Sequence, residues 1–319
     1  MTTFTTSDAI GEREQLADVI YRIDPDETPI FSAVKKSTGN GIFLEWQIQE
    51  LAAASATNYA TEGADASIAA ATPTVRAGNY MQVSQKSYAI SNTLEQVDKA
   101  GRERESQYQR VLKSLELRRD IEKMIGDTNV ARSGSDPRKS ASLMTWITNG
   151  SVGSGSTFSA GLGTDTVTVG TAASRGLTLA LIEDGMQDAW TDGGSPELMV
   201  TSAANRAVFS DLSASTNLVN NQVNMTKAKE VTYVGSTSVF LTDFGTIEVA
   251  PSRFMSNDKL FLIDPSFVEV ATLNGRNFAE NEIAATGDAE KFQIICEWTL
   301  KPLAPKAHAA VLDLDGTAA

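Results

Sequence analysis

Apolar and polar residues alternate one by one over residues 41–50, a spacing that predicts a β-strand with one apolar face. That face carries Ile42, Leu44, Trp46 and Ile48. A second strand is predicted over residues 75–90, and Ala, Ser, Thr and Gly dominate the stretch 52–74 between the two. No Asn-Gly or similar tight-turn pair joins the strands, so we predict a long two-stranded arm with an irregular tip. Such an arm is not stable alone in water, and we expect it to lie on a neighbouring copy of the chain.

A long helix is predicted over residues 95–126. In its first half, apolar residues recur at helical spacing on one face, at Tyr108, Val111, Leu112 and Leu115. In its second half they move to roughly the opposite side, at Leu117, Ile121, Met124 and Ile125. A buried face that switches midway predicts different partners for the two halves. The like-charged pair Glu116 and Asp120 needs a cation, for which Arg119 or an arginine of a neighbouring copy is the candidate.

The first 40 residues predict an arm with a short helix over residues 11–22. Pro25 and Pro29 end that helix, and a small apolar anchor follows at Ile30, Phe31 and Val34. An arm of this kind has little to bury by itself, so we expect it to pack on another part of the assembly.

Glycine, serine and aspartate dominate residues 132–163, which predicts loops around one apolar island, 143–147. Within this region, residues 150–156 have the composition of a flexible linker, and we expect a boundary between two lobes near residue 170.

Helices and strands alternate in the second lobe. Helices are predicted from about Leu179 to Trp190 and from Ser202, a candidate N-cap, to Leu212. Strands are predicted at 198–200, 231–234, 239–243, 247–250 and 260–264. Two final strands, 291–300 and 308–314, are expected to return to the first lobe. The pattern is α+β with mixed strands.

The amino-acid composition argues against several classes of protein. The 319 residues are 41% hydrophobic, enough for a sizeable core, and the net charge of −13 repels nucleic acid rather than gripping it. One cysteine excludes an internal disulfide framework. The N-terminal residues do not have the pattern of a signal peptide, and no stretch of about 20 apolar residues could cross a membrane. We therefore expect a protein made and used in a cytoplasm, with no membrane partner.

Candidate chemistry is sparse. Cys296 lies in an apolar run and is predicted to be a buried core residue rather than a nucleophile. The single histidine, His308, is expected to be partly exposed beside a strand. Asp313 and Asp315, in an Asp-x-Asp-Gly segment, are expected to lie in a frayed tail. We predict no catalytic, cofactor-binding or metal-binding residues and no enzyme activity, although 40 acidic residues leave a carboxylate hydrolase as an open alternative.

Several segments resemble the SU10-like major head proteins, a branch of the tailed-phage major capsid proteins with the Hong Kong 97-type fold. They are Gly245–Met255, Thr286–Lys291, Glu297–Leu300 and Pro305–Ala309. The resemblance implies five parts: an N-terminal arm (1–40), an extended loop (41–90), a peripheral domain with a spine helix (91–173), an axial domain (174–284), and strands returning to the peripheral domain with a C-terminal tail (285–319).

The resemblance also implies a function. The chain is expected to self-assemble, as pentamers and hexamers, into the icosahedral shell of a virion that encloses double-stranded DNA. Its expected partners are other copies of itself, a separate scaffolding protein, a portal, decoration proteins and non-specifically contacted DNA, with assembly in the host cytoplasm. Because residues 41–85 contain no lysine, we predict no lysine–asparagine cross-link from this loop. An encapsulin, a bacterial shell of the same fold, is the alternative.

Candidate subunit-interface residues follow from the arm. Trp46 and Ile48 are expected to be exposed in a lone subunit and covered by a neighbour. Four loop carboxylates need cationic partners, for which four arginines are the candidates. The set is Glu45, Glu50, Glu62, Asp65, Arg102, Arg104, Arg118 and Arg119.

Overall fold

The computed structural model describes residues 25–63, 65–66, 68, 70–99, 101, 103–169, 174–215 and 239–318. The helix predicted over residues 11–22, the strand predicted at 231–234 and Arg102 lie outside these residues.

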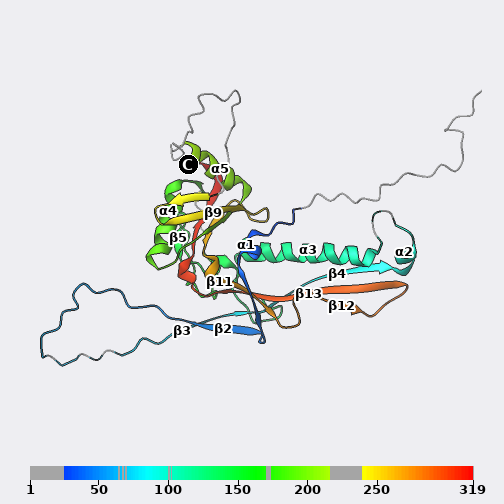
Figure 1. The fold of residues 1–319 in the computed structure, drawn as a ribbon, viewed down its shortest axis with the longest axis horizontal. Helices are drawn as coiled ribbons and strands as arrows, with labels where there is room; N and C mark the ends of the chain where they lie inside the picture. Colours follow the sequence, from blue (N-terminus) through cyan, green and yellow to red (C-terminus); the bar gives the residue numbers. More distant parts are fainter. Residues whose placement is uncertain are drawn as a thin grey trace, which may run out of the picture.

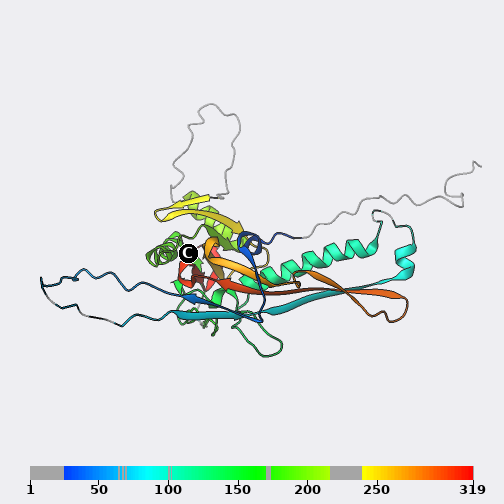
Figure 2. The same ribbon diagram turned by 60° about the horizontal axis from the view of Figure 1, so that its bottom comes forward.

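A five-stranded sheet is built around the long strand β13 (Ala289–Pro302). β4 (Gln82–Ser91) pairs antiparallel with β13 along one side, and β11 (Val268–Leu273) and β12 (Ala279–Ile283) pair with the other side. β1 (Lys35–Gly39) extends the sheet parallel to β11. The helix α3 (Glu105–Gly126) lies along β4, and together they form the elongated part of the molecule (Figures 1 and 2).

The long helix begins ten residues later than predicted. A short helix, α2 (Asn92–Gln96), precedes it, and the chain turns between the two at Gly101, whose φ is +75°. The carboxylate of Glu95 then caps α3, because it accepts hydrogen bonds from the Glu105 N–H (3.1 Å) and the Ser106 hydroxyl (2.9 Å). The interruption therefore positions a capping side chain at the start of α3.

The face predicted for the second half of α3 is buried, but the face predicted for the first half is not. In the second half, Leu117, Ile121 and Ile125 are fully buried in the core, whereas Val111 in the first half is 56% exposed. The cations that answer the like-charged pair are lysines: Lys113 contacts Glu116 at 2.7 Å and Lys86 contacts Asp120 at 2.6 Å. Arg119, the candidate within the chain, forms no ion pair with them among the described residues, because the strand β4 brings Lys86 alongside the helix.

The predicted apolar anchor is confirmed. α1 (Pro29–Ala33) buries Ile30 and Phe31 against α3, and Val34 follows them into the core. The buried carboxylate of Glu122 accepts hydrogen bonds from the N–H groups of Ile30 (3.0 Å) and Phe31 (2.7 Å). Burial raises the pKa of this carboxyl. The anchor thus packs on its own chain.

A six-stranded sheet forms the other body of the molecule, with the strand order β5-β14-β10-β7-β9-β8. Helices α4 (Leu179–Thr191) and α5 (Ala203–Ser215) are capped at their N-termini by the hydroxyls of Thr178 and Ser202. The strands are β5 (Asn149–Ser151), β7 (Leu198–Thr201), β8 (Val239–Thr242), β9 (Gly245–Pro251), β10 (Lys259–Ile263) and β14 (Ala309–Leu312). Both final strands were expected to return to the first lobe. β13 does so, because it pairs with β4 in the five-stranded sheet. β14 does not, because it pairs with β10 and β5 in the six-stranded sheet.

Residues 150–156 were predicted to form a flexible linker. This prediction is wrong for Gly150 and Ser151, which belong to β5 of this sheet. β5 pairs with β14, and Gly150 adopts a φ of +112°. A Cβ atom at Gly150 would lie 2.2 Å from the carbonyl oxygen of Ala310. The glycine is therefore required for close approach of two strands rather than for flexibility.

The C-terminal residues are ordered, contrary to the frayed tail that we expected. β15 (Leu314–Ala318) pairs parallel with β6 (Arg175–Leu177), and Leu314 is buried. The Asp313 carboxylate accepts a hydrogen bond from the Gly153 N–H at 2.8 Å. The Asp313 carbonyl accepts a hydrogen bond from the Arg175 N–H at 2.9 Å, so the Asp-x-Asp-Gly segment also contacts the start of β6.

Cys296 and His308 are both buried in the core. Cys296 is buried as predicted, and burial raises the pKa of its thiol to about 11. His308 is also completely buried, so the prediction of partial exposure is wrong. Its Nδ1 accepts a hydrogen bond from the Asp264 N–H at 3.1 Å, because the 3₁₀ turn Pro305–Ala307 directs the chain inward at this point.

Burial of His308 predicts a loss of stability in acid. Burial lowers the pKa of the imidazole to about 4, below the ~6.5 of the unfolded chain, so the unfolded state binds more protons. Stability is therefore lost as the pH falls below about 6.5, by about 2 kcal/mol between pH 7.5 and pH 5. Urea unfolding at both pH values measures this loss. His308→Asn, whose amide oxygen can accept the same N–H, is expected to remove most of it, and an equal loss in both proteins would contradict the assignment.

Candidate functional site at the root of the extended loop

Within the extended loop expected over residues 41–90, residues 49–74 connect β2 (Phe43–Ile48) to β3 (Val75–Tyr80), and the name extended loop is used for residues 49–74 from here on. The two strands pair antiparallel from Phe43 opposite Tyr80 to Ile48 opposite Val75, so a two-stranded arm is present. The single second strand predicted over residues 75–90 is wrong, because the chain divides there into β3 and β4, and β4 pairs with β13 in the body. The described residues of the loop beyond them form no helix or strand, and the loop runs far out from the body (Figures 1 and 2, blue to cyan at the left).

Large apolar side chains are exposed along the extended loop. Leu51 is 97%, Tyr59 is 87% and Ile68 is 95% exposed. Apolar side chains of this size cost free energy in water, and a projecting loop has no surface of its own to cover them. The loop therefore has the chemistry of a segment that binds another surface.

The root of the extended loop is anchored in the body by aromatic contacts. The ring of Trp46 lies 5.3 Å from that of Trp146, and Phe43 lies 4.4 Å from Tyr80. Trp46 and Ile48 pack, partly buried, on the main core of their own chain. The expectation that a lone subunit leaves them exposed is wrong, because the apolar island at residues 143–147, where Leu143–Thr145 forms a 3₁₀ turn, folds beneath them.

A buried amide fixes β3 to the rest of the body. The Asn79 side chain is fully buried and donates to the Leu300 carbonyl (2.7 Å) and the Ser140 hydroxyl (3.1 Å). Its oxygen accepts from the N–H groups of Ala141 and Tyr80, both at 3.0 Å. The amide thus has two donated and two accepted hydrogen bonds, which hold the loop root against β13.

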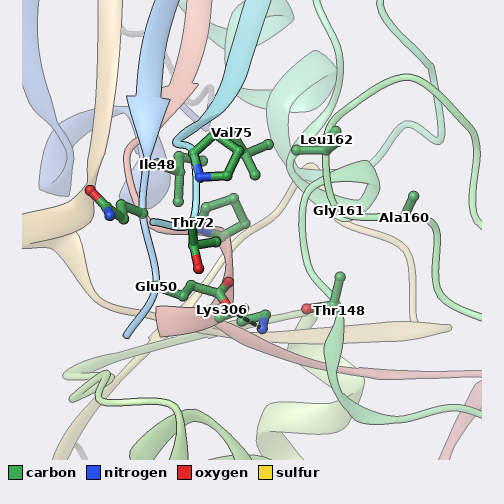
Figure 3. Close-up of a pocket in the computed structure, with 12 residues that line it drawn as sticks. Ile48, Glu50, Thr72, Val75, Thr148, Ala160, Gly161, Leu162 and Lys306 are labelled. Atoms are coloured by element: carbon green, nitrogen blue, oxygen red, sulfur yellow. Dashed lines mark hydrogen bonds and ion pairs between the residues drawn. The ribbon is translucent and has the colours of Figure 1, made fainter. Parts of the chain in front are cut away.

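A hollow of about 270 Å³ lies beside the loop root (Figure 3). Its apolar wall includes Ile48, Val75 and Leu162. Lys306 donates to the Glu50 carboxylate at 2.7 Å across the hollow's edge, and this bond raises the pKa of the Lys306 ammonium. The carbonyl of Lys306 accepts from Asn149, which also donates to Asp192, so the first residues of the extended loop are tied to β5 and α4.

The Glu50–Lys306 pair is expected to contribute little to stability. Both side chains are about half exposed, and exposed ion pairs contribute about 0.2–1 kcal/mol. Lys306→Met is therefore expected to lower the free energy of unfolding by less than about 1 kcal/mol, measured by urea unfolding. Glu197→Gln, at an exposed position just before β7, serves as the control. A loss above about 2 kcal/mol would contradict this weak-pair assignment.

The structure separates the predicted interface residues. Two loop carboxylates are paired within the chain, Glu45 with Arg76 at 3.5 Å and Glu50 with Lys306. Glu62 and Asp65 are exposed and form no ion pair within the described residues. The sequence analysis missed Arg76 and Lys306; the first could have been found, since it lies on the strand predicted to pair with the one carrying Glu45.

The arginine candidates lie in two different places. Arg104 is exposed at the N-cap of α3, at the end of the molecule away from the extended loop (Figure 1). Arg118 donates to the Ser32 hydroxyl at 2.7 Å and lies 5.4 Å from the Phe31 ring. Arg119 lies 5.4 Å from the Phe254 ring. Within the described residues none of the three contacts a loop carboxylate of the same chain.

Ligand-binding chemistry is not apparent in the described part of the chain. No group of three or more His, Cys, Asp or Glu side chains there could hold a metal ion. None of the helices described is both long and apolar enough to cross a bilayer.

Comparison with known proteins gives the family. The model of the SU10 major capsid protein family matches residues 1–315. The chain belongs to the SU10 major capsid protein family. The chain is also similar to the major capsid protein of Escherichia phage Phieco32, with 30% identity over 146 residues. That match spans 43% of this chain and 42% of the Phieco32 protein, less than half of each.

Solved structures share the fold of this SU10-family chain. A chain of the cyanophage A-1(L) capsid asymmetric unit superposes with a TM-score of 0.65 and 11% identity, over 97% of this chain and 98% of its own. A chain of the holo-SrpI encapsulin complex of Synechococcus elongatus gives 0.58 and 9%, over 96% and 94%. The resemblance in fold is thus confirmed: mixed helices and sheets in the Hong Kong 97-like arrangement of phage capsid proteins.

Proposed function

We propose that this chain is the major capsid protein of a tailed phage, which assembles into an icosahedral shell around double-stranded DNA. Membership of the SU10 family supports this function. The observation that carries it is the extended loop, which exposes Leu51, Tyr59 and Ile68 almost completely. No part of the chain that the structure describes covers those side chains, which favours cover by another molecule.

The shape of the chain supports assembly into a closed shell. The extended loop projects at one end of the body, and α2 with the start of α3 lies at the other (Figure 1). A loop that binds a different part of the next copy makes a head-to-tail contact, and head-to-tail contacts close into rings when the rotation allows. Pentamers and hexamers of this kind are the capsomers of a shell.

The remaining assignments follow the family. We propose that α3 is the spine helix of a peripheral domain and that the six-stranded sheet with α4 and α5 belongs to the axial domain. Separate scaffolding, portal and decoration proteins are the proposed partners, and the acidic surface is proposed to let packaged DNA move without sticking. These roles place the chain in the virion, after assembly in the host cytoplasm.

Electron microscopy of the purified full chain, after size-exclusion chromatography, tests the function. Closed shells or capsomers are the expected result. A small oligomer that never forms shells would contradict the proposal and favour the hydrolase alternative. Shells that enclose a protein cargo and no DNA when isolated from the native source would favour the encapsulin alternative, which the fold alone also allows.

A further inference from the structure

Asparagine followed by glycine occurs three times in the chain, at Asn40-Gly41, Asn149-Gly150 and Asn274-Gly275. In such a pair the backbone nitrogen of the glycine can attack the side-chain amide carbon of the asparagine, because glycine has no Cβ to hinder the approach or to restrict the backbone. The attack requires a side chain that can turn toward the nitrogen and a glycine N–H that is free of hydrogen bonds. The fold meets these two conditions differently at the three places.

The surroundings of Asn149 oppose the attack. Its side-chain amide donates to the Asp192 carboxylate and to the Lys306 carbonyl, both at 2.8 Å. The Gly150 N–H donates to the Asp188 carboxylate at 3.3 Å, and β5, which carries this glycine, is paired with β14. Both reacting groups are therefore held in other contacts, and several hydrogen bonds must break before the two can meet.

Asn274 lies in the exposed turn between β11 and β12. A hydrogen bond from the Arg276 N–H to the Leu273 carbonyl at 2.9 Å closes this turn, and Gly275 adopts a φ of +77° within it. Neither the Asn274 side chain nor the Gly275 N–H has a hydrogen-bond partner in the part of the chain that the structure describes. Both reacting groups of this pair are therefore free and accessible to water.

Asn40 lies in a second exposed turn, between β1 and β2. Among the described residues, its side chain and the Gly41 N–H also have no hydrogen-bond partner. The two turns are neighbours, because β1 pairs parallel with β11 as far as Gly39 opposite Leu273, and the Asn274 N–H donates to the Gly39 carbonyl at 3.1 Å. Two unrestrained asparagines thus follow directly on the last paired residues of β1 and β11.

We propose that Asn40 and Asn274 form a site of spontaneous deamidation in the folded chain, and that the contacts of Asn149 exclude it from the same reaction. In each turn the glycine nitrogen forms a bond to the asparagine side-chain carbon, the bond from that carbon to the amide nitrogen breaks, and ammonia leaves with the proton of the glycine N–H. Water then opens the resulting five-membered imide at either carbonyl. The products are aspartate and isoaspartate, and each adds one negative charge.

The modification changes one small region of the surface. Reaction at both turns places two new carboxylates next to each other, in a region that includes the half-exposed Arg276. Isoaspartate also lengthens the backbone by one carbon, in the turn whose Asn274 N–H contacts the Gly39 carbonyl. The reaction takes place within one folded subunit, so it does not depend on the proposed shell function.

Peptide mapping by mass spectrometry of the full-length chain, incubated in its folded state at mildly alkaline pH, tests this site. Deamidation raises the mass of a peptide by the difference between a hydroxyl and an amino group, and alkaline pH favours it because the attacking nitrogen must lose its proton. Asn40 and Asn274 are expected to react at least about tenfold faster than Asn149, whose hydrogen bonds must first break. In urea, where the fold is lost, all three are expected to react at similar rates.

Two variants separate the effect of the fold from that of the sequence. Gly41→Ala is tolerated sterically, because the nearest atom to the new Cβ is the Phe43 carbonyl oxygen at 3.5 Å, but the methyl group hinders the attack. It is expected to slow the reaction of Asn40 at least about tenfold and to leave that of Asn274 unchanged. Asp188→Ala with Asp192→Ala frees the groups at Asn149 and is expected to speed its reaction at least about threefold.

Circular dichroism and the melting temperature show that each variant folds. Equal rates at the three asparagines of the folded wild-type chain would overturn the proposal. It would also be overturned by rates at Asn40 and Asn274 that are more than about tenfold lower in the folded chain than in urea, since the fold would then protect all three. An unchanged rate at Asn40 in the Gly41→Ala chain, or at Asn149 in the double variant, would contradict the role given to the local contacts.

Discussion

Shortening the extended loop is expected to abolish shell formation and to leave the subunit folded. Replacement of residues 52–71 by Gly-Ser-Gly-Ser keeps Glu50 and the paired strands β2 and β3, but removes Tyr59 and Ile68. Within the described residues, the removed segment makes no contact with the core. Closing a loop less than half as long costs about 0.8 kcal/mol less, so the stability of the subunit is expected to be unchanged or slightly higher.

Electron microscopy and analytical ultracentrifugation measure the loss of particles, and urea unfolding measures the stability. A loop of full length with Ser55→Thr and Thr57→Ser serves as the control, because it keeps every large apolar side chain and every charge. Normal shells from the shortened chain would contradict the role of the loop. A large fall in stability would instead show that residues 52–71 pack on the body.

Local periodicity predicted most of the long elements. Alternation over residues 41–50 predicted β2, and helical spacing predicted the buried face of the second half of α3, at Leu117 and Ile121. The N-cap at Ser202 was also found, because capping depends on residues three apart in the chain. In these cases the residues that determine the structure lie within a few positions of one another in the sequence.

Predictions failed where a distant segment decides the environment. Gly150 has the composition of a linker, but its conformation is fixed by Ala310, far along the chain. His308 is buried by the turn before it and by Asp264. Trp46 was correctly placed on an apolar face, but its cover, Trp146, comes from a region that the sequence predicts as loop. The spacing of residues within one segment does not predict which side chains of distant segments will contact it.

The candidate site shows the same limit. The loop carboxylates were identified from their types, yet sequence alone could not separate Glu45 and Glu50, which are paired within the chain, from Glu62 and Asp65, which are not. Likewise Arg104, at the N-cap of α3, lies more than three helical turns from Arg118 and Arg119. The structure therefore separates the loop carboxylates that are paired within the chain from those that are not.

The buried carboxylate of Glu297 links three segments of the body that lie beneath the loop root. Glu297 on β13 is 4% exposed and receives Arg138 at 2.6 Å and Arg276 at 2.9 Å. Arg138 comes from the loop that also supplies the partners of Asn79, and Arg276 from the turn between β11 and β12. The Glu297 side chain therefore holds the loop that carries Arg138 and the turn that carries Arg276 against β13.

Glu297→Ala is expected to lower the free energy of unfolding by about 2–3 kcal/mol, because it removes a charge-assisted hydrogen bond from the largely buried Arg138, whereas Arg276 is about half exposed and can be solvated. Guanidinium or urea unfolding of the chain with the shortened loop measures this, since a subunit that does not assemble gives a stability independent of concentration. Glu282→Ala, an exposed carboxylate on the neighbouring strand β12, is the matched control and is expected to change stability by less than about 0.5 kcal/mol. Equal losses in the two variants would mean that solvent already screens the Glu297 pairs, and that hydrophobic packing alone holds the two arginine-bearing segments on β13.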